Sequence, residues 1–206
     1  MAVTVIGLLV AGVGIAVIRR CDIDPIRADG ALKAATSLTA RSGFQEALTL
    51  LDHACRLAPL EPMYPLMRGR TALSAAEAAP DGTKKDRLFD LAGSSLELAR
   101  DLAPLDPDHH ANVGRYSVTR ALSEVHSAQR TRLLERAVAN YEAALELRPT
   151  SVVFLNEFGR LLINMGQGDR ARQVLERAVA LDPLFSGPAS ALAALDRIER
   201  AGSTPR

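Results

Sequence analysis

The chain has 206 residues, of which 48% are hydrophobic and 24% are charged, and its net charge is +1. This balance is typical of a folded protein and argues against a disordered one. Because there is no basic excess, we expect no nucleic-acid partner. Cys21 and Cys55 lie far apart and in no metal-ligand spacing, so the sequence predicts no disulfide framework, no metal site and no cofactor.

The amino-terminal residues 2–18 carry no charge, and Thr4 is their only polar side chain. At about 1.5 Å per residue a helix over this segment spans roughly 25 Å, slightly short of a bilayer core. The sequence therefore predicts a transmembrane helix over residues 1–20 and a linker over 21–26, with a buried helix or a signal sequence as the alternatives. Arg19 and Arg20 follow the apolar run, so the positive-inside rule places the rest of the chain on the cytoplasmic side.

Four similar phrases each end in a proline: Pro59, Pro104, Pro149 and Pro183, at spacings of 45, 45 and 34 residues. Because proline cannot continue a helix, each of them closes one unit of a repeated pattern. The pattern predicts helix hairpins over residues 27–60, 61–104, 106–149 and 150–183, a capping helix over 186–200 and a disordered tail over 201–206.

The two long units differ from the last one by eleven residues. The second unit holds the polar stretch "AAPDGTKKD", which predicts a turn around Pro80 and Gly82. The third unit holds "SEVHSAQRTR", which has neither proline nor glycine and is expected to lengthen both helices.

Small residues recur at fixed places in the units. In the last unit Gly159, Ala171 and Ala178 are expected where helix backbones approach, because a larger side chain would push the helices apart. The equivalent residues of the other units are Ala47, Ala54, Gly69, Ala92, Ala99, Gly114, Ala137 and Ala144.

This 34-residue pattern of small residues resembles the tetratricopeptide repeat. The resemblance implies an all-α fold, a right-handed α-solenoid with a concave groove that binds a protein or peptide partner. With the apolar segment, the whole chain is expected to be such a solenoid preceded by one transmembrane helix. Asp108 and Asn112 are expected to cap and brace the first helix of the third unit.

A narrower resemblance covers nearly the whole chain. The phrases "DIDPIRADGALKAA", "LAPLDPDHHANVGRY" and "FLNEFGRLL" look like the carboxyl-terminal part of bacterial O-antigen ligase or polymerase membrane proteins. The resemblance implies a single-pass protein of the bacterial cell membrane that is linked to surface-polysaccharide assembly and has a polytopic membrane protein as a partner. Two alternatives remain: a generic scaffold or assembly factor for another membrane complex, and the non-catalytic tail of a polytopic ligase.

Three arginines follow a repeat glycine: Arg70, Arg115 and Arg160. If they face the groove, their guanidinium groups suit the carboxylates or phosphates of an acidic peptide, a chain terminus or an anionic glycan. Alternatively, they pair with neighbouring Glu or Asp side chains. Asn156 and Asn164 are expected to bind a partner's backbone in the same groove.

No catalytic residue is predicted. The nucleophile motif GxSxG and the phosphate-loop motif GxxxxGK[ST] are both absent. The polytopic domain that would carry the chemistry of the resembled ligases is also absent from the 206 residues, so we expect the chain not to be an enzyme.

Overall fold

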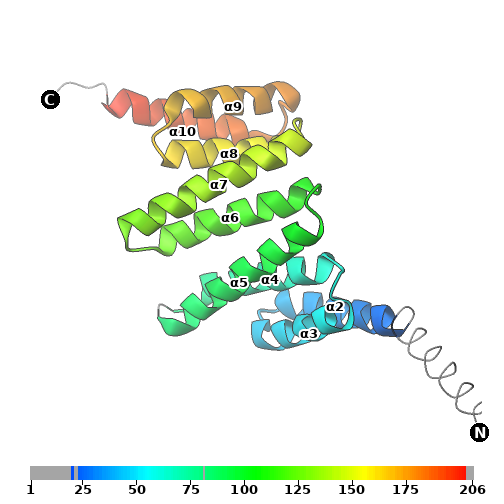
Figure 1. The fold of residues 1–206 in the computed structure, drawn as a ribbon. Coiled ribbons are helices and arrows are strands. Elements are labelled where there is room, and N and C mark those ends of the chain that lie inside the picture. Colours follow the sequence, from blue (N-terminus) through cyan, green and yellow to red (C-terminus); the bar gives the residue numbers. More distant parts are fainter. Residues whose placement is uncertain (1–19, 21–22, 81, 203–206) are drawn as a thin grey trace, which may run out of the picture. The chain divides into compact units, whose positions relative to one another are not determined.

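The computed structural model describes residues 20, 23–80 and 82–202. This part of the chain is all-α, with nine α-helices and no strand (Figure 1). The chain divides into two compact units, unit 1 with Met1–Leu102 and unit 2 with Ala103–Arg206. Each unit is a stack of helix hairpins, so the predicted all-α, tetratricopeptide-like solenoid is confirmed at this level.

Unit 1 consists of two hairpins. Its helices are α2 (Asp24–Thr39), α3 (Phe44–Leu57), α4 (Met63–Ala78) and α5 (Thr83–Leu102). Helices α2 and α3 pack as one hairpin, α4 and α5 as the next, and α3 contacts α4. Helix α2 begins inside the predicted linker, because Pro25 stands in its first turn, where a fixed φ favours helix initiation.

Unit 2 consists of two hairpins and a final helix. Its helices are α6 (Pro107–Ser123), α7 (Ser127–Leu147), α8 (Val152–Asn164), α9 (Gly168–Leu181) and α10 (Ser186–Gly202). Helix α10 packs against both α9 and α8. Its Leu195 is 3% exposed and joins the core cluster that contains Phe154 and Phe158.

The cap of α6 differs from the expectation. The side chain of Asp106, not Asp108, accepts a hydrogen bond from the backbone N–H of Asp108 at 2.9 Å. Asp106 precedes Pro107, which pushes it into the extended conformation that a capping residue needs. The Asp108 carboxylate lies 3.0 Å from Arg148 on α7, while Asn112 donates to the Asp108 backbone carbonyl at 2.7 Å and so braces the first turns.

The hairpins are closely packed at their small residues. The alanines of the repeated pattern are fully buried: Ala47, Ala54, Ala92, Ala99, Ala137, Ala144, Ala171 and Ala178. A Cβ added at Gly69 would lie 2.6 Å from Cγ of Leu96, and one at Gly159 would lie 2.5 Å from Cγ of Leu175. At Gly114 the nearest atom, a ring carbon of Tyr141, would be 3.0 Å away. Larger residues at these glycines would force the paired helices apart.

The eleven additional residues of the second hairpin lengthen its two arms. Gly69 lies nine residues before the end of α4, whereas the equivalent Gly159 lies five residues before the end of α8, so the part of α4 that follows the glycine is four residues longer. Ala92 lies nine residues after the start of α5 and Ala171 three after the start of α9, so α5 is six residues longer. The loop between α4 and α5 is one residue longer than the loop between α8 and α9, which accounts for the last of the eleven residues. Figure 1 shows α4 and α5 reaching beyond α2 and α3.

The expected membrane localisation is corrected by the structure. Among the helices of the described residues, none combines the length and the hydropathy needed to cross a bilayer. The prediction of a single-pass membrane protein with cytoplasmic repeats is therefore wrong on this finding. The predicted transmembrane segment, residues 1–20, lies almost entirely outside the described residues.

Candidate functional site

A pocket of about 270 Å³ lies between α8 and α10 of unit 2. One wall comes from α8, with Arg160, Ile163 and Asn164, and the other from α10. The residues of the α10 wall are Ser190, Ala191, Ala194 and Ile198. Two of the predicted groove residues, Arg160 and Asn164, therefore line one pocket, because they stand four residues apart on the same face of α8.

The polar groups of this pocket are available. Arg160 and Asn164 are both exposed, and neither has a hydrogen bond or ion pair to any other described residue. Ala191 is 3% exposed and Ile198 is 57% exposed, so the α10 wall offers an apolar floor and an accessible apolar rim. The pocket combines one free guanidinium, one free amide and a small apolar hollow.

Asn156 lies one turn before Arg160 on α8 and has a different environment. An added Cβ at Gly187 of α10 would lie 3.1 Å from Nδ2 of Asn156, so the two helices approach closely here and a larger residue would require the Asn156 side chain to shift. The Oδ1 atom of Asn156 is buried and has no hydrogen-bond partner among the described residues. Asn156 is therefore placed at the contact between α8 and α10 and not in the open pocket.

Arg115 is engaged within unit 2. Its Nε atom donates to both carboxylate oxygens of Glu157 at 2.9 Å, and its Nη1 atom donates to Oδ1 of Asn112 at 3.3 Å. Burial raises the pKa of the neighbouring Tyr141, and the Glu157 carboxylate raises it further. For Arg115 the structure shows the alternative that the sequence left open, pairing with a neighbouring acidic residue.

Arg70 lies on α4 of unit 1. Its side chain is exposed, and no hydrogen bond or ion pair joins it to another residue in the described ranges. Of the three arginines, Arg115 is thus paired with an acidic residue, whereas Arg70 and Arg160 have no partner among the described residues.

Sequence reasoning missed the larger hollow, a cleft of about 670 Å³ between α3 and α5 of unit 1. It also missed the α10 wall of the smaller pocket, because the capping helix was expected only to cover apolar surface. The spacing of Ser190, Ala194 and Ile198 at four residues could have indicated a second face on α10.

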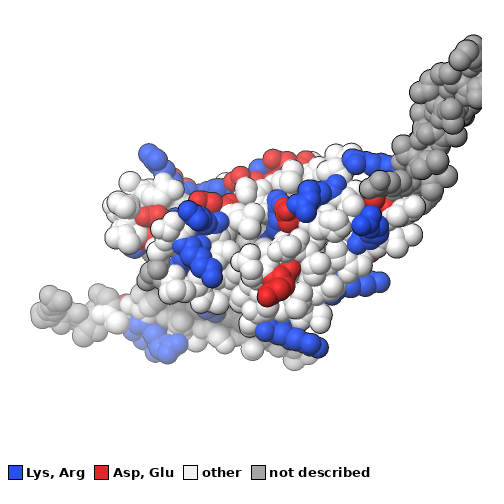
Figure 2. All heavy atoms as spheres, turned by 90° about the horizontal axis from the view of Figure 1, so that it is seen from below, with Lys and Arg blue, Asp and Glu red and all other residues white. Residues whose placement is uncertain are grey.

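The charges show no single-signed surface on the face seen in Figure 2. Lys and Arg side chains are scattered there among Asp, Glu and uncharged residues. Within the described residues no group of His, Cys, Asp and Glu side chains is arranged to hold a metal ion. The available polar groups suit recognition of a small anionic or amide-bearing group.

Comparison with known proteins supports the fold. Residues 133–195 match the sequence model of the tetratricopeptide repeat family. No curated protein matches the chain. The resemblance to O-antigen ligases finds no support in these comparisons, whereas the tetratricopeptide repeat does.

Several solved structures are similar to the chain. A thermophilic TPR protein from Thermus thermophilus is 21% identical, with 82% of this chain and 80% of that chain covered and a TM-score of 0.64. YrrB, described as a TPR protein with an unusual peptide-binding site, is 16% identical, with coverages of 82% and 76% and a TM-score of 0.57. The first TPR of Spaghetti, bound to the HSP90 peptide SRMEEVD, is 18% identical, with coverages of 69% and 95% and a TM-score of 0.54. At these identities the likeness shows the fold alone, an all-α array of tetratricopeptide-like helix hairpins.

Proposed function

We propose that the chain is a general tetratricopeptide-repeat scaffold that binds an acidic peptide segment of a partner protein in the pocket between α8 and α10. The observation that carries the proposal is the position of Arg160, an available cation at the edge of an apolar pocket. Neither wall of the pocket presents an acidic side chain. A carboxylate is therefore the group that this pocket would select.

The recognition divides between two kinds of contact. The Arg160 guanidinium forms paired hydrogen bonds to a carboxylate, from an acidic side chain or from a chain terminus. The Asn164 amide has both a donor and an acceptor and so pairs with a peptide unit of the partner's backbone. The volume, about 270 Å³, suits one side chain or the end of a chain, not a large ligand.

The remaining predicted groove residues have supporting roles in this proposal. Asn156 lies at the contact between α8 and α10, and Arg115 is neutralised by Glu157 and so adds little net attraction. Arg70 is a second available cation, and it belongs to unit 1.

The similar structures support binding as the kind of activity. The HSP90 peptide in the Spaghetti complex has two glutamates and an aspartate in its sequence, SRMEEVD. A role in surface-polysaccharide assembly would name the partner more closely, but it rests on the resemblance of phrases such as "LAPLDPDHHANVGRY" alone. The proposal of a general scaffold rests only on the fold and on the Arg160 pocket. That the chain is not an enzyme stays a prediction.

Fluorescence anisotropy with labelled peptides of about ten residues tests this proposal. The probes are peptides with two acidic residues at a free carboxyl terminus, and matched peptides with Gln, Asn and an amidated end. We expect Arg160→Glu to weaken binding of the acidic peptides by about tenfold or more, and Asn164→Ala to weaken it less. Added salt should reduce the difference between the two peptide sets.

Arg132→Glu provides the matched control. Arg132 is exposed on α7 and does not line the pocket, so the variant has the same change of charge elsewhere on unit 2. Equal losses in Arg132→Glu and Arg160→Glu would show a general charge effect and refute the pocket as the site. Equal affinity for acidic and amidated peptides would refute carboxylate recognition.

A further inference from the structure

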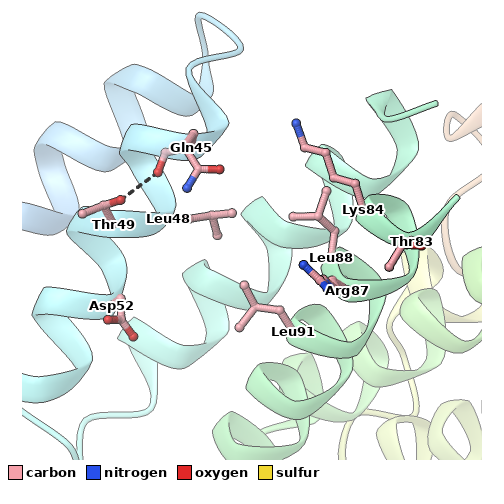
Figure 3. A pocket seen from close by; sticks show the side chains of 9 residues that line it. All are labelled: Gln45, Leu48, Thr49, Asp52, Thr83, Lys84, Arg87, Leu88 and Leu91. Carbon is pink, nitrogen blue, oxygen red and sulfur yellow. Dashed lines mark hydrogen bonds between the residues drawn. The ribbon is translucent and has the colours of Figure 1, made fainter. Parts of the chain in front are cut away.

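The cleft between α3 and α5 of unit 1 is formed by two facing helical stripes (Figure 3). On α3 the lining residues are Gln45, Leu48, Thr49 and Asp52, spaced as i, i+3, i+4 and i+7. This spacing places them on one face of the helix. The α3 wall is therefore one continuous strip, about two turns long.

The wall on α5 repeats the same spacing, with Lys84, Arg87, Leu88 and Leu91. The first three lie in the six residues by which α5 exceeds α9, so a 34-residue repeat of ordinary length has no equivalent of them. Figure 3 shows the leucine side chains of both walls projecting into the space between the helices. The lengthened hairpin thus adds a wall to this cleft.

The charged lining residues of the cleft that have no ion-pair partner among the described residues are both positive, Lys84 and Arg87. Asp52, its one acidic lining residue, already pairs with Arg68 at 3.1 Å and with Arg56. In the part of the chain that the structure describes, neither Lys84 nor Arg87 has an ion pair or a hydrogen-bond partner. An occupant with acidic groups beside Lys84 and Arg87 would be attracted without displacing an existing pair.

The walls favour a helical occupant. Leu48, Leu88 and Leu91 form an apolar strip between the two helices, and the rise from Lys84 to Leu91 is about 10 Å, or two helical turns. An amphipathic helix that lies in a groove presents its own apolar side chains at three- and four-residue spacings, which match such a strip. An extended peptide that binds by strand addition needs an exposed strand edge, and the described residues contain no strand.

We infer that the α3–α5 cleft binds an acidic amphipathic helix of a partner protein. Its apolar face packs on Leu48, Leu88 and Leu91, and its acidic residues pair with Lys84 and Arg87. The site lies in unit 1, and it is independent of the Arg160 pocket of unit 2.

Nuclear magnetic resonance on the full ¹⁵N-labelled chain tests this inference. The probe is a synthetic helical peptide of about fifteen residues with leucines at i, i+3, i+4 and i+7 and glutamates beside them. A matched peptide has lysine in place of each glutamate. We expect the glutamate peptide to shift the backbone amides of Gln45, Thr49 and Arg87, and the lysine peptide to leave them unmoved.

Two variants separate the cleft from general charge. The double variant Lys84→Glu with Arg87→Glu should lower the affinity for the glutamate peptide by about tenfold or more. Lys33→Glu, at an exposed residue of α2 outside the cleft, should leave its affinity unchanged. Circular dichroism and urea unfolding of each variant confirm that the fold is retained.

The contrary outcomes are distinct. No amide shift at the cleft up to about 1 mM peptide overturns the inference. Shifts confined to Arg160 and Asn164 overturn it but leave the proposed function standing. Equal binding of the lysine peptide shows apolar contact without the charge pairing and also overturns it. A dimer in light scattering that Leu88→Asp dissociates would overturn it by assigning the cleft to a second copy of the chain.

Discussion

Gly159 shows how a single residue sets the distance between two helices. A Cβ there would lie 2.5 Å from Cγ of Leu175, closer than real side-chain contacts. Glycine inside a helix costs about 1 kcal/mol relative to alanine, so the close packing must offset that loss. The repeat spacing identified this position without a structure. It could not identify the partner of Arg115, because Glu157 lies 42 residues away and many acidic residues compete.

Gly159→Ala is expected to lower the free energy of unfolding by about 1–3 kcal/mol, since the new methyl group overpacks the contact with Leu175. Gly30→Ala is the matched control. No atom lies within 4 Å of a Cβ added at Gly30 in α2, so alanine should stabilise the helix by about 0.5–1 kcal/mol. Urea unfolding followed by circular dichroism measures both. Destabilisation of similar size in the two variants would contradict the packing argument.

Tyr64 gives the protein a predicted weakness at high pH. Burial, helped by the hydrogen bond that its hydroxyl donates to Asp29 at 2.9 Å, raises its pKa to about 12. An unfolded tyrosine has a pKa near about 10. Between these values unfolding releases a proton, so the free energy of unfolding should fall as pH rises from about 10 to about 12. Tyr64→Phe should flatten this fall in urea unfolding, and an unchanged slope would show that Tyr64 does not cause it.

At the scale of elements, the hairpins differ in the length of their helices, whereas small residues lie where the paired helices cross in each hairpin. The extra residues of the third hairpin lengthen its helices, chiefly α7 with 21 residues against 14 in α9, as the absence of proline and glycine predicted. The two pockets could not be predicted from the sequence, because each depends on which faces two helices present to each other. Helix α10 illustrates this limit, because one face packs on the core and another lines the Arg160 pocket.

The packing of α10 is testable through Leu195. This side chain is 3% exposed in the core cluster of unit 2, so Leu195→Ala should leave a cavity and cost about 2–5 kcal/mol. Ile198→Ala, at a residue of the same helix that is 57% exposed, should cost well under about 1 kcal/mol. Thermal and urea unfolding of both variants give the comparison. If the two losses are equal, α10 does not pack as described.

At the scale of the whole chain, repeat length explains which part is recognisable in sequence. The tetratricopeptide family match covers residues 133–195, which begin as the added residues of α7 end and include the unit of ordinary length. The longer units keep the small residues but not the spacing. The all-α repeat fold was predictable because it depends on local periodicity. The localisation prediction was wrong, because no helix within residues 23–80 and 82–202 is both long and apolar enough to cross a bilayer.

Unit 2 is expected to fold by itself. It holds two hairpins and α10, and its core cluster, with Phe154, Phe158 and Leu195, lies within residues 103–206. A fragment of residues 103–206 should show helical circular dichroism and a cooperative thermal transition. The same fragment without residues 186–206 should melt at a lower temperature or lose cooperativity, because a terminal helix covers apolar surface. A non-cooperative transition of the longer fragment would contradict this expectation.

The lengthened arms of α4 and α5 have a consequence for how such a protein can change. The added residues lie at the tip of the hairpin, beyond the crossing at Gly69, Ala92 and Leu96, so the contacts that join the helices are undisturbed. Insertions at the tip of a hairpin are therefore tolerated, because they leave the stacking of the repeats unchanged. New binding surface can arise there by mutation without a compensating change elsewhere in the array. The useful variation among related chains should accordingly be sought in arm length as much as in groove residues.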